Sequence, residues 1–253
     1  MPESLAETQI EVVVDGVESA LAAQSGGAQR IELCSGLLEG GLTPSSGLIA
    51  VTRAAATIGL MVMIRPRSGD FVYSHHELTV MQRDIDTAKE LGADGVVFGI
   101  LTEEGVIDAR RTATLTAQAR PLSVTFHRAF DMVADAPYAL ECLIDLGIER
   151  VLTSGLESSA LEGAETIAAL VNQAGGRIIV MPGGGVTVRN IRRILVTTGA
   201  REIHLSGCKP VASTMRYRNP NVHMGAALYP PDYVHLTTAA ERIRACRAAL
   251  LHD

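Results

Sequence analysis

The chain has 253 residues, a formal net charge of −6 and 47% hydrophobic residues, but only 4% aromatic residues and no tryptophan. Acidic and basic residues are interspersed, which predicts no basic surface for nucleic acid or for an anionic membrane. The four cysteines have no paired spacing and indicate reduced thiols, and neither a leader-like N-terminus nor a long apolar run is present. We therefore expect a cytoplasmic protein.

Short apolar segments rich in β-branched residues alternate with amphipathic segments along the whole chain. Eight predicted strands span residues 10–15, 30–35, 60–66, 95–101, 122–127, 150–154, 177–181 and 201–206. Predicted helices between and after them include residues 17–24, 78–91, 136–146, 164–173, 188–196 and 241–251. A core built of Val, Ile, Leu and Ala is typical of a buried parallel sheet with helices packed around it.

The repeated strand-helix order predicts a single (β/α)8 TIM barrel over about residues 10–207. A doubly wound Rossmann sheet is the alternative, but no G-x-G-x-x-G sequence follows the first strand. After the barrel, we expect residues 208–232 to form a long loop that serves as a lid or as a homo-oligomer interface. Residues 233–253 are expected to form a C-terminal helix.

Functional residues of TIM barrels lie at the carboxyl ends of the strands. Strand alternation directs Ile31 and Leu33 toward the helices, so Glu32 and Cys34 are expected inside the barrel. The same reasoning and the strand-end positions give a set of candidate ligand-binding residues: Glu11, Arg65, Arg67, Thr153, Gly183, Gly184, Gly185, His204 and Ser206. Buried charges are costly unless they pair. The alternative is that they form an internal ion-pair network that only fills the barrel.

Three consecutive glycines, Gly183 to Gly185, follow the seventh predicted strand and come directly before a predicted helix. Their backbone N–H groups and the helix N-terminus could hold a phosphate or carboxylate, although a tight turn needs the same glycines. Arg65 and Arg67 could clamp such an anion from the third strand. The alternative is that Arg65 pairs with Glu32 and that Arg67 faces solvent.

His127, at the end of the fifth predicted strand, has the chemistry for acid-base catalysis or for metal binding. We expect His127 and Glu32 to form the catalytic pair if the protein is an enzyme. Cu(I) prefers thiolate and thioether ligands, and Cys34 with Met61 or Met63 on the neighbouring strand is the soft pair near the barrel.

Six motifs along the chain resemble, in order, those of the CutC family. They are RIELCS (30–35) with EGGLTPS (39–45), IRPRSGDF (64–71), VTFHRAFDM (124–132), RVLTSG (150–155), MPGGG (181–185) and MRYRN (215–219). The resemblance implies a cytoplasmic (β/α)8 barrel associated with copper homeostasis, with copper bound through cysteine. It also implies a cysteine on the first strand, where this chain has Val13 facing the Cys34 position.

Three functions follow from the sequence. The first is a copper-homeostasis protein of the CutC type that binds Cu(I) through Cys34. The second is an enzyme or sensor for a small phosphate-bearing or carboxylate-bearing metabolite, held by the glycine loop, Arg65 and Arg67. The third is a structural barrel that acts through contacts within a homo-oligomer. None of the three involves nucleic acid or a membrane.

Overall fold

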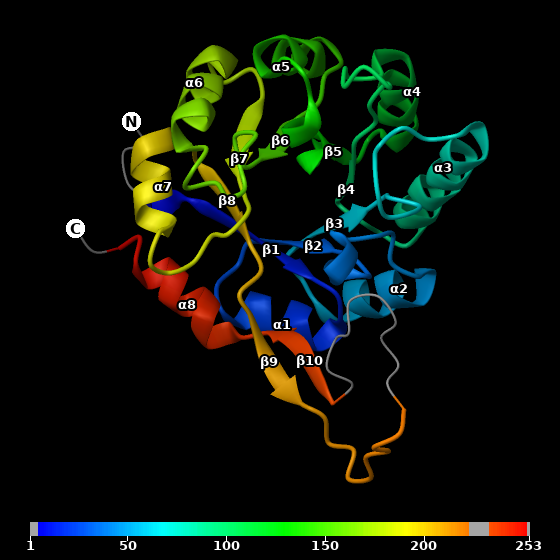
Figure 1. Cartoon of the computed structure of the whole chain (residues 1–253), viewed down its shortest axis with the longest axis vertical. Helices are drawn as coiled ribbons and strands as arrows, with labels where there is room; N and C mark the ends of the chain where they lie inside the picture. Colours follow the sequence, from blue (N-terminus) through cyan, green and yellow to red (C-terminus); the bar gives the residue numbers. More distant parts are fainter. Residues whose placement is uncertain (1–4, 223–232, 252–253) are drawn as a thin grey trace.

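The computed structural model describes residues 5–222 and 233–251, and its eight-stranded parallel sheet forms a barrel surrounded by helices (Figure 1). The strand order is β7-β6-β5-β4-β3-β2-β1-β8, and β7 lies against β8, so the sheet closes on itself. The strands are β1 Gln9–Val14, β2 Arg30–Leu33, β3 Gly59–Met63, β4 Gly95–Phe98, β5 Ser123–Phe126, β6 Arg150–Thr153, β7 Ile179–Pro182 and β8 Glu202–Leu205. The predicted single TIM barrel is confirmed.

Helices connect successive strands and cover the outside of the barrel (Figure 1). They are α1 Val17–Ser25, α2 Ser46–Ala55, α3 His75–Glu90, α4 Ala109–Ala119, α5 Ala136–Asp145, α6 Ala164–Ala174, α7 Ile191–Thr198 and α8 Ala240–Ala248. Short 3-10 helices are η1 Leu5–Glu7, η2 Leu37–Glu39 and η3 Arg128–Met132. Local sequence sets the ends of several helices: Ser74 and Glu77 form a reciprocal capping box at the start of α3. No described helix has the length and apolar character needed to cross a membrane.

Two groups of buried apolar side chains lie on opposite faces of the strands. The larger group packs between the strands and the helices and includes Ile31 and Leu33, as strand alternation predicts. The smaller group lies inside the barrel and consists of Cys34, Met61, Met63 and Val97, with Val13 and Leu37 packed against it. We call this smaller group the sulfur cluster.

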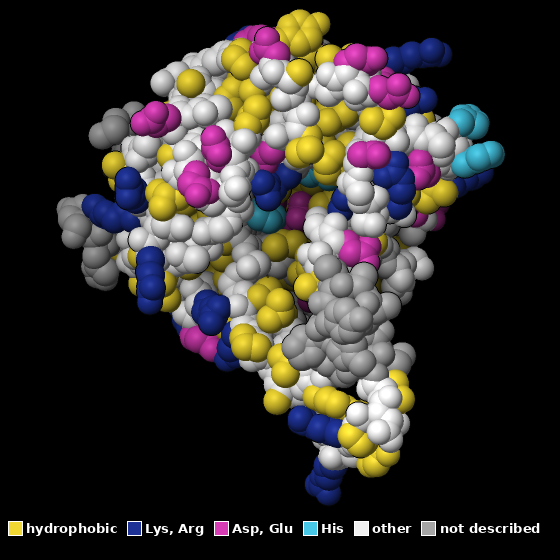
Figure 2. All heavy atoms as spheres, in the orientation of Figure 1, with side chains coloured by type: hydrophobic (Ala, Val, Ile, Leu, Met, Phe, Trp, Pro, Cys, Tyr) yellow, Lys and Arg dark blue, Asp and Glu magenta, His cyan; other side chains and the backbone are white. Residues whose placement is uncertain are grey.

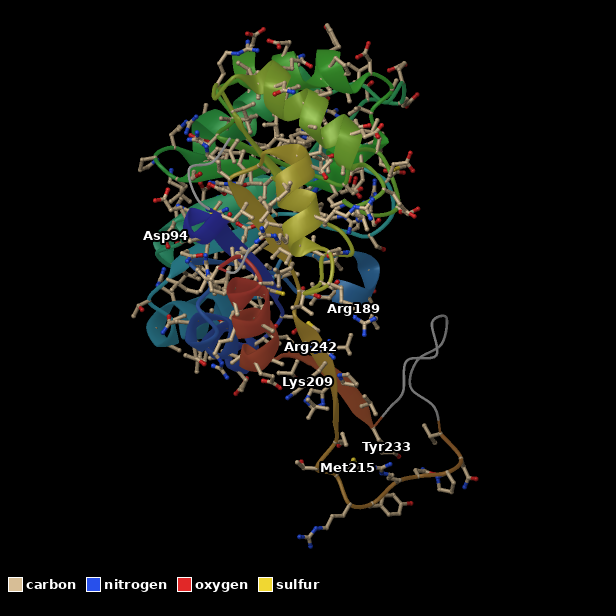
Figure 3. All side chains as sticks on the ribbon, turned by 90° about the vertical axis from the view of Figure 1, so that its left-hand side faces the viewer. Asp94, Arg189, Lys209, Met215, Tyr233 and Arg242 are labelled. Atoms are coloured by element: carbon tan, nitrogen blue, oxygen red, sulfur yellow. The ribbon has the colours of Figure 1, made fainter. Side chains whose placement is uncertain are left out.

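An antiparallel ribbon of two strands follows the barrel, where the sequence predicted a loop and then a helix. Strand β9 Cys208–Ala212 pairs with β10 Val234–Thr238, and the arm they carry projects away from the barrel (Figure 3). The β-branched run in β10 favours a strand, and Thr238 donates its backbone N–H to Ser19 Oγ on α1, so the helix begins only at Ala240. Residues 223–232 of the predicted loop lie outside the described residues.

Candidate functional site

Charged side chains gather in a hollow at the centre of the barrel, where Figure 2 shows histidine, acidic and basic groups side by side. The innermost of them form an ion-pair layer around Glu202. This carboxylate accepts hydrogen bonds from Arg30 Nη2 at 2.5 Å and from Arg150 Nε at 2.6 Å. Arg30 also donates to Glu11, and Arg150 donates to Thr125 Oγ1 at 3.2 Å. The layer joins β1, β2, β5, β6 and β8. For these residues it matches the internal ion-pair network that was expected from the sequence as the alternative to a ligand-binding site.

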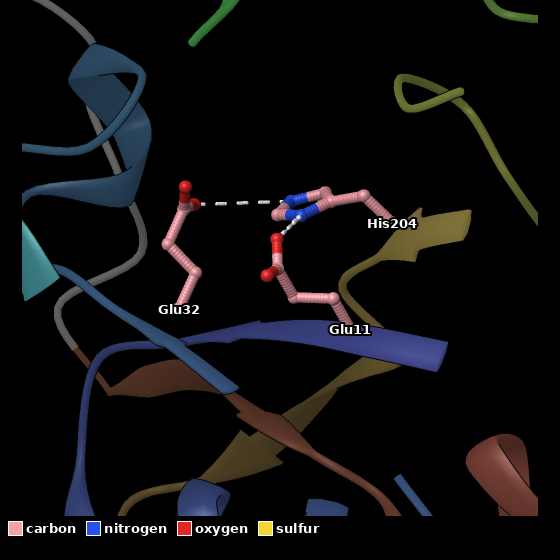
Figure 4. A group of neighbouring side chains, drawn as sticks. All are labelled: Glu11, Glu32 and His204. Atoms are coloured by element: carbon pink, nitrogen blue, oxygen red, sulfur yellow. Dashed lines mark hydrogen bonds and ion pairs between the residues drawn. The ribbon is translucent and has the colours of Figure 1, made fainter. Parts of the chain in front are cut away.

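Above this layer, Glu11 from β1 meets two further groups, Glu32 from β2 and His204 from β8 (Figure 4). We call the three residues the carboxylate-imidazole cluster. His204 Nδ1 lies 2.8 Å from Glu11 Oε1, and its Nε2 lies 3.9 Å from Glu32 Oε2. Glu11 is fully buried, and Glu32 and His204 are 3% and 8% exposed. The register that pairs Glu11 with His204 across β1 and β8 brings together residues from the first and the last strand of the barrel.

The two carboxyl groups of this cluster have pKa values shifted in opposite directions. Burial acts to raise the pKa of Glu11, but the hydrogen bond from His204 and the charge of Arg30 outweigh it and lower the pKa to about 2. Burial raises the pKa of Glu32 to about 7, since His204 opposes it only in part and Glu11 adds to it. Glu11 is therefore ionised near neutral pH, and Glu32 can gain or lose a proton there.

The thiol of Cys34 lies between the cluster and the sulfur side chains of β3. Its Sγ donates to Glu32 Oε2 over 3.7 Å, and it packs with Met61 and Met63. Burial, followed by the charge of Glu32, raises the pKa of the thiol well above its usual range. Gly41 covers it closely, because a Cβ at this position would lie 3.1 Å from Sγ. The predicted proximity of Cys34 to the two methionines is present in the structure.

The two arginines of the third strand and its loop bind protein groups. Arg65 donates to the backbone carbonyls of Glu39, Gly41 and Gly69 at 2.8–3.1 Å, so it fixes the loops after β2 and β3 instead of pairing with Glu32. Arg67 forms ion pairs with Asp70 at 2.9 Å and Glu77 at 2.6 Å. The Arg67 side chain is 35% exposed, so it faces solvent in part while it pairs with these carboxylates. Arg65 Nε is buried without a hydrogen-bond partner in the described part of the chain.

His127 lies in a separate, mainly apolar environment. Its Nδ1 accepts from the backbone N–H of Ala129 at 3.1 Å, and its ring packs 4.9 Å from the ring of Phe71. Gly99 makes room for it, since a Cβ there would lie 2.6 Å from the imidazole. Burial and then the charge of Arg65 lower the pKa of His127 to about 3, so the ring is neutral near pH 7. The group in contact with Glu32 is His204, whereas the sequence paired Glu32 with His127.

The glycine loop after β7 packs against the cluster. Gly183 lies beside His204, where a Cβ would approach the Cβ of His204 to 3.1 Å, and Gly184 has a φ of +102°. Helix α7 starts only at Ile191, so the loop does not lead directly into a helix as the sequence predicted. These glycines meet the steric needs of a tight loop beside His204.

Two other candidates make local contacts. The hydroxyl of Thr153 donates to Asp131 Oδ1 at 2.5 Å, and Ser206 is an exposed residue beyond β8. Sequence reasoning gave no role to Asp131, Arg30 or Arg150. Arg30 shares the inward face of β2 with Glu32, so the alternation that placed Glu32 could also have placed Arg30.

Comparison with known proteins identifies the family of this chain. A model of the CutC family matches residues 8–209, which is most of the chain. The chain belongs to the CutC family. The family match ends at the start of β9, so the projecting arm lies beyond it.

Curated CutC relatives span nearly the whole chain. The protein named copper homeostasis protein cutC homolog in Mus musculus is 55% identical over 239 residues, covering 94% of this chain and 88% of the mouse protein. The human homolog of the same name has the same identity and coverage. A crystal structure of a CutC from Streptococcus agalactiae matches with a TM-score of 0.75 and 35% identity, covering 79% of this chain and 98% of that chain. An aldolase, QR15, at 14% identity and a TM-score of 0.61, shares the fold alone.

In this CutC chain Val13 occupies the position where the resemblance implies a cysteine. It packs against the sulfur cluster that holds Cys34, so the two positions do face each other inside the barrel. The sulfur-containing groups of this cluster are accordingly one thiol and two thioethers.

Proposed function

We propose that this CutC protein binds copper as Cu(I) inside the barrel, with Cys34 as the anionic ligand. The observation that supports this most directly is the sulfur cluster, in which the Cys34 thiol packs with Met61 and Met63. Thiolate and thioether sulfur are the ligands that Cu(I) prefers. The free state of all four cysteines suits a reducing compartment such as the cytoplasm.

Copper binding at Cys34 requires the thiol to lose its proton. Cys34 Sγ donates to Glu32 Oε2 over 3.7 Å, so this carboxylate is placed to accept the proton. Burial raises the pKa of the thiol, and we expect Cu(I) affinity to increase with pH over the neutral range because the ion competes with this proton.

Competition with a colorimetric Cu(I) chelator under reducing, oxygen-free conditions tests the proposal. We expect wild-type protein to take one Cu(I), and Cys34→Ser to lose this stoichiometric binding. Cys142→Ser, which removes a half-buried thiol from α5, is the matched control and is expected to bind as the wild type does. Full binding by Cys34→Ser, or loss in both variants, would contradict a site at Cys34.

A second function, an enzyme of proton transfer acting on a small anionic metabolite, rests on the separated pKa values of Glu11 and Glu32. Carboxyl groups with pKa values of about 2 and about 7 are suited to one ionised and one proton-exchanging role. In this case His204 replaces His127 as the partner of Glu32. The engagement of Arg65 and Arg67 with protein acceptors favours the copper proposal over this one.

Exchange of carbon-bound protons for deuterium tests the enzyme proposal separately from the copper proposal. A panel of sugar phosphates and carboxylic acids is incubated with the protein in D2O and followed by NMR. An enzyme of this kind should label one member, and Glu32→Gln should slow the exchange by about 100-fold or more. If no compound is labelled faster than in buffer, the enzyme proposal fails and the copper proposal is unaffected.

A further inference from the structure

We propose that Glu32 and His204 form a site for a divalent transition-metal ion, with Glu11 as the group that orients the histidine. One ligand atom from each of the three residues lies within 4.8 Å of the others, and all three residues are buried. The site is separate in its chemistry from the sulfur cluster, because its donors are carboxylate oxygen and imidazole nitrogen. Ions such as Zn²⁺ accept this donor set.

The contacts of His204 fix the nitrogen that would bind the metal. The ring nitrogen Nδ1 is held by Glu11 Oε1 at 2.8 Å, so Nε2 is the ring nitrogen that faces Glu32 (Figure 4). A carboxylate behind a metal-binding histidine is a recurrent arrangement, since it fixes the tautomer and the ring plane. Arg30 anchors Glu11 from below and thereby holds the whole arrangement in place.

The space between His204 and Glu32 has the width of a bridging metal ion. Nε2 and Oε2 are 3.9 Å apart, too far for a hydrogen bond, while metal bonds of about 2.0–2.2 Å from each atom span this gap. Glu32 Oε1 is buried without a hydrogen-bond partner in the described part of the chain. A buried carboxylate oxygen without a partner is costly, and a cation would satisfy it.

The charges inside the barrel also leave room for a cation. Glu11, Glu32 and Glu202 contribute three carboxylates to the interior, and Arg30 and Arg150 contribute two guanidiniums, which pair with Glu11 and Glu202. Metal binding requires Glu32 to be ionised and His204 to be neutral, and this set then carries one excess negative charge. That excess favours a cation in the space between Glu32 and His204.

Calorimetric titration of metal-free protein with Zn²⁺ at neutral pH tests the site. We expect one Zn²⁺ per chain, with affinity lowered at least 10-fold in Glu32→Gln and in His204→Gln, and about 10-fold to 100-fold in Glu11→Gln. Cys142→Ser, which lies on α5 outside the barrel, is the control and is expected to keep the wild-type affinity. Wild-type protein without stoichiometric Zn²⁺ binding, or a loss in Cys142→Ser as large as in Glu32→Gln, would overturn the proposal.

Absorption spectra of wild-type protein loaded with Co²⁺ test the ligands without any substitution. A site of nitrogen and oxygen donors gives d–d bands without thiolate-to-metal charge transfer. A charge-transfer band would instead place the metal on Cys34 and sink the present inference. Because the copper proposal is tested with Cu(I) on Cys34→Ser, either proposal can fail while the other survives.

Discussion

The sulfur cluster and the carboxylate-imidazole cluster occupy two walls of one barrel and differ in polarity and in donor atoms. The wall of β2, β3 and β4 carries Cys34, Met61, Met63 and Val97, which are apolar or soft. The wall of β8, β1 and β2 carries His204, Glu11 and Glu32, which are ionisable. Strand β2 belongs to both, with Glu32 and Cys34 two residues apart on its inward face. A step of two residues along this segment thus changes the available donor atom from carboxylate oxygen to thiol sulfur.

The ion-pair layer beneath both walls offers the largest expected effect. Glu202→Gln removes the carboxylate that binds Arg30 and Arg150, which leaves two buried guanidiniums short of a counter-charge. We expect the free energy of unfolding, measured by urea denaturation, to fall by about 3–5 kcal/mol. Glu241→Gln breaks an exposed ion pair with Lys209 and is the control, expected to change stability little. Equal effects of the two substitutions would mean that the interior layer is not needed for stability.

A second thiol in the sulfur cluster is expected to have the next largest effect, and it would increase the difference in Cu(I) binding between the two clusters. Val13 packs against the sulfur cluster, so Val13→Cys places a second thiol near Cys34. We expect Cu(I) affinity in chelator competition to rise on the order of 100-fold, because a second thiolate suits this ion. Val13→Ser, which adds a polar atom without sulfur, should bind no better than the wild type. An unchanged affinity in Val13→Cys would show that the copper ion does not reach this cluster.

The smallest expected effect is on the pH dependence of stability, which tests Glu32 in the carboxylate-imidazole cluster. Burial raises the pKa of Glu32 to about 7, so the folded state retains a proton that the unfolded state loses near the ordinary value of 4.5. Stability from this group is therefore complete below about pH 4.5 and is lost as the pH rises through 7.

Glu32→Gln removes this titration. We expect the variant to unfold with a free energy close to that of the wild type at pH 5 and higher by on the order of 1–3 kcal/mol at pH 8, as measured by denaturant titration. Parallel stability profiles for the two proteins between pH 5 and 8 would contradict a raised pKa for Glu32.

Periodicity in the sequence was enough to predict the eight strands and the inward face of β2. It placed Glu32 and Cys34 in the interior and brought Cys34 close to Met61 and Met63, because these residues lie on neighbouring strands. Period-two alternation is a local property that a strand carries wherever it packs. The same alternation placed His204 and Glu11 inside the barrel without showing that they meet.

Closure of the barrel determined which interior side chains contact each other. Glu11 and His204 are 193 residues apart and meet because β1 pairs with β8, so Glu32 faces His204 while His127 lies against Phe71. Pairing with Glu32 was the alternative to anion binding for Arg65, which instead binds backbone carbonyls of two loops. No pattern in the sequence revealed the path of these loops. The sequence by itself determined which side chains enter the interior. Only the tertiary structure decided which of them touch, because contacts across a closed sheet depend on the register of strands far apart in the chain.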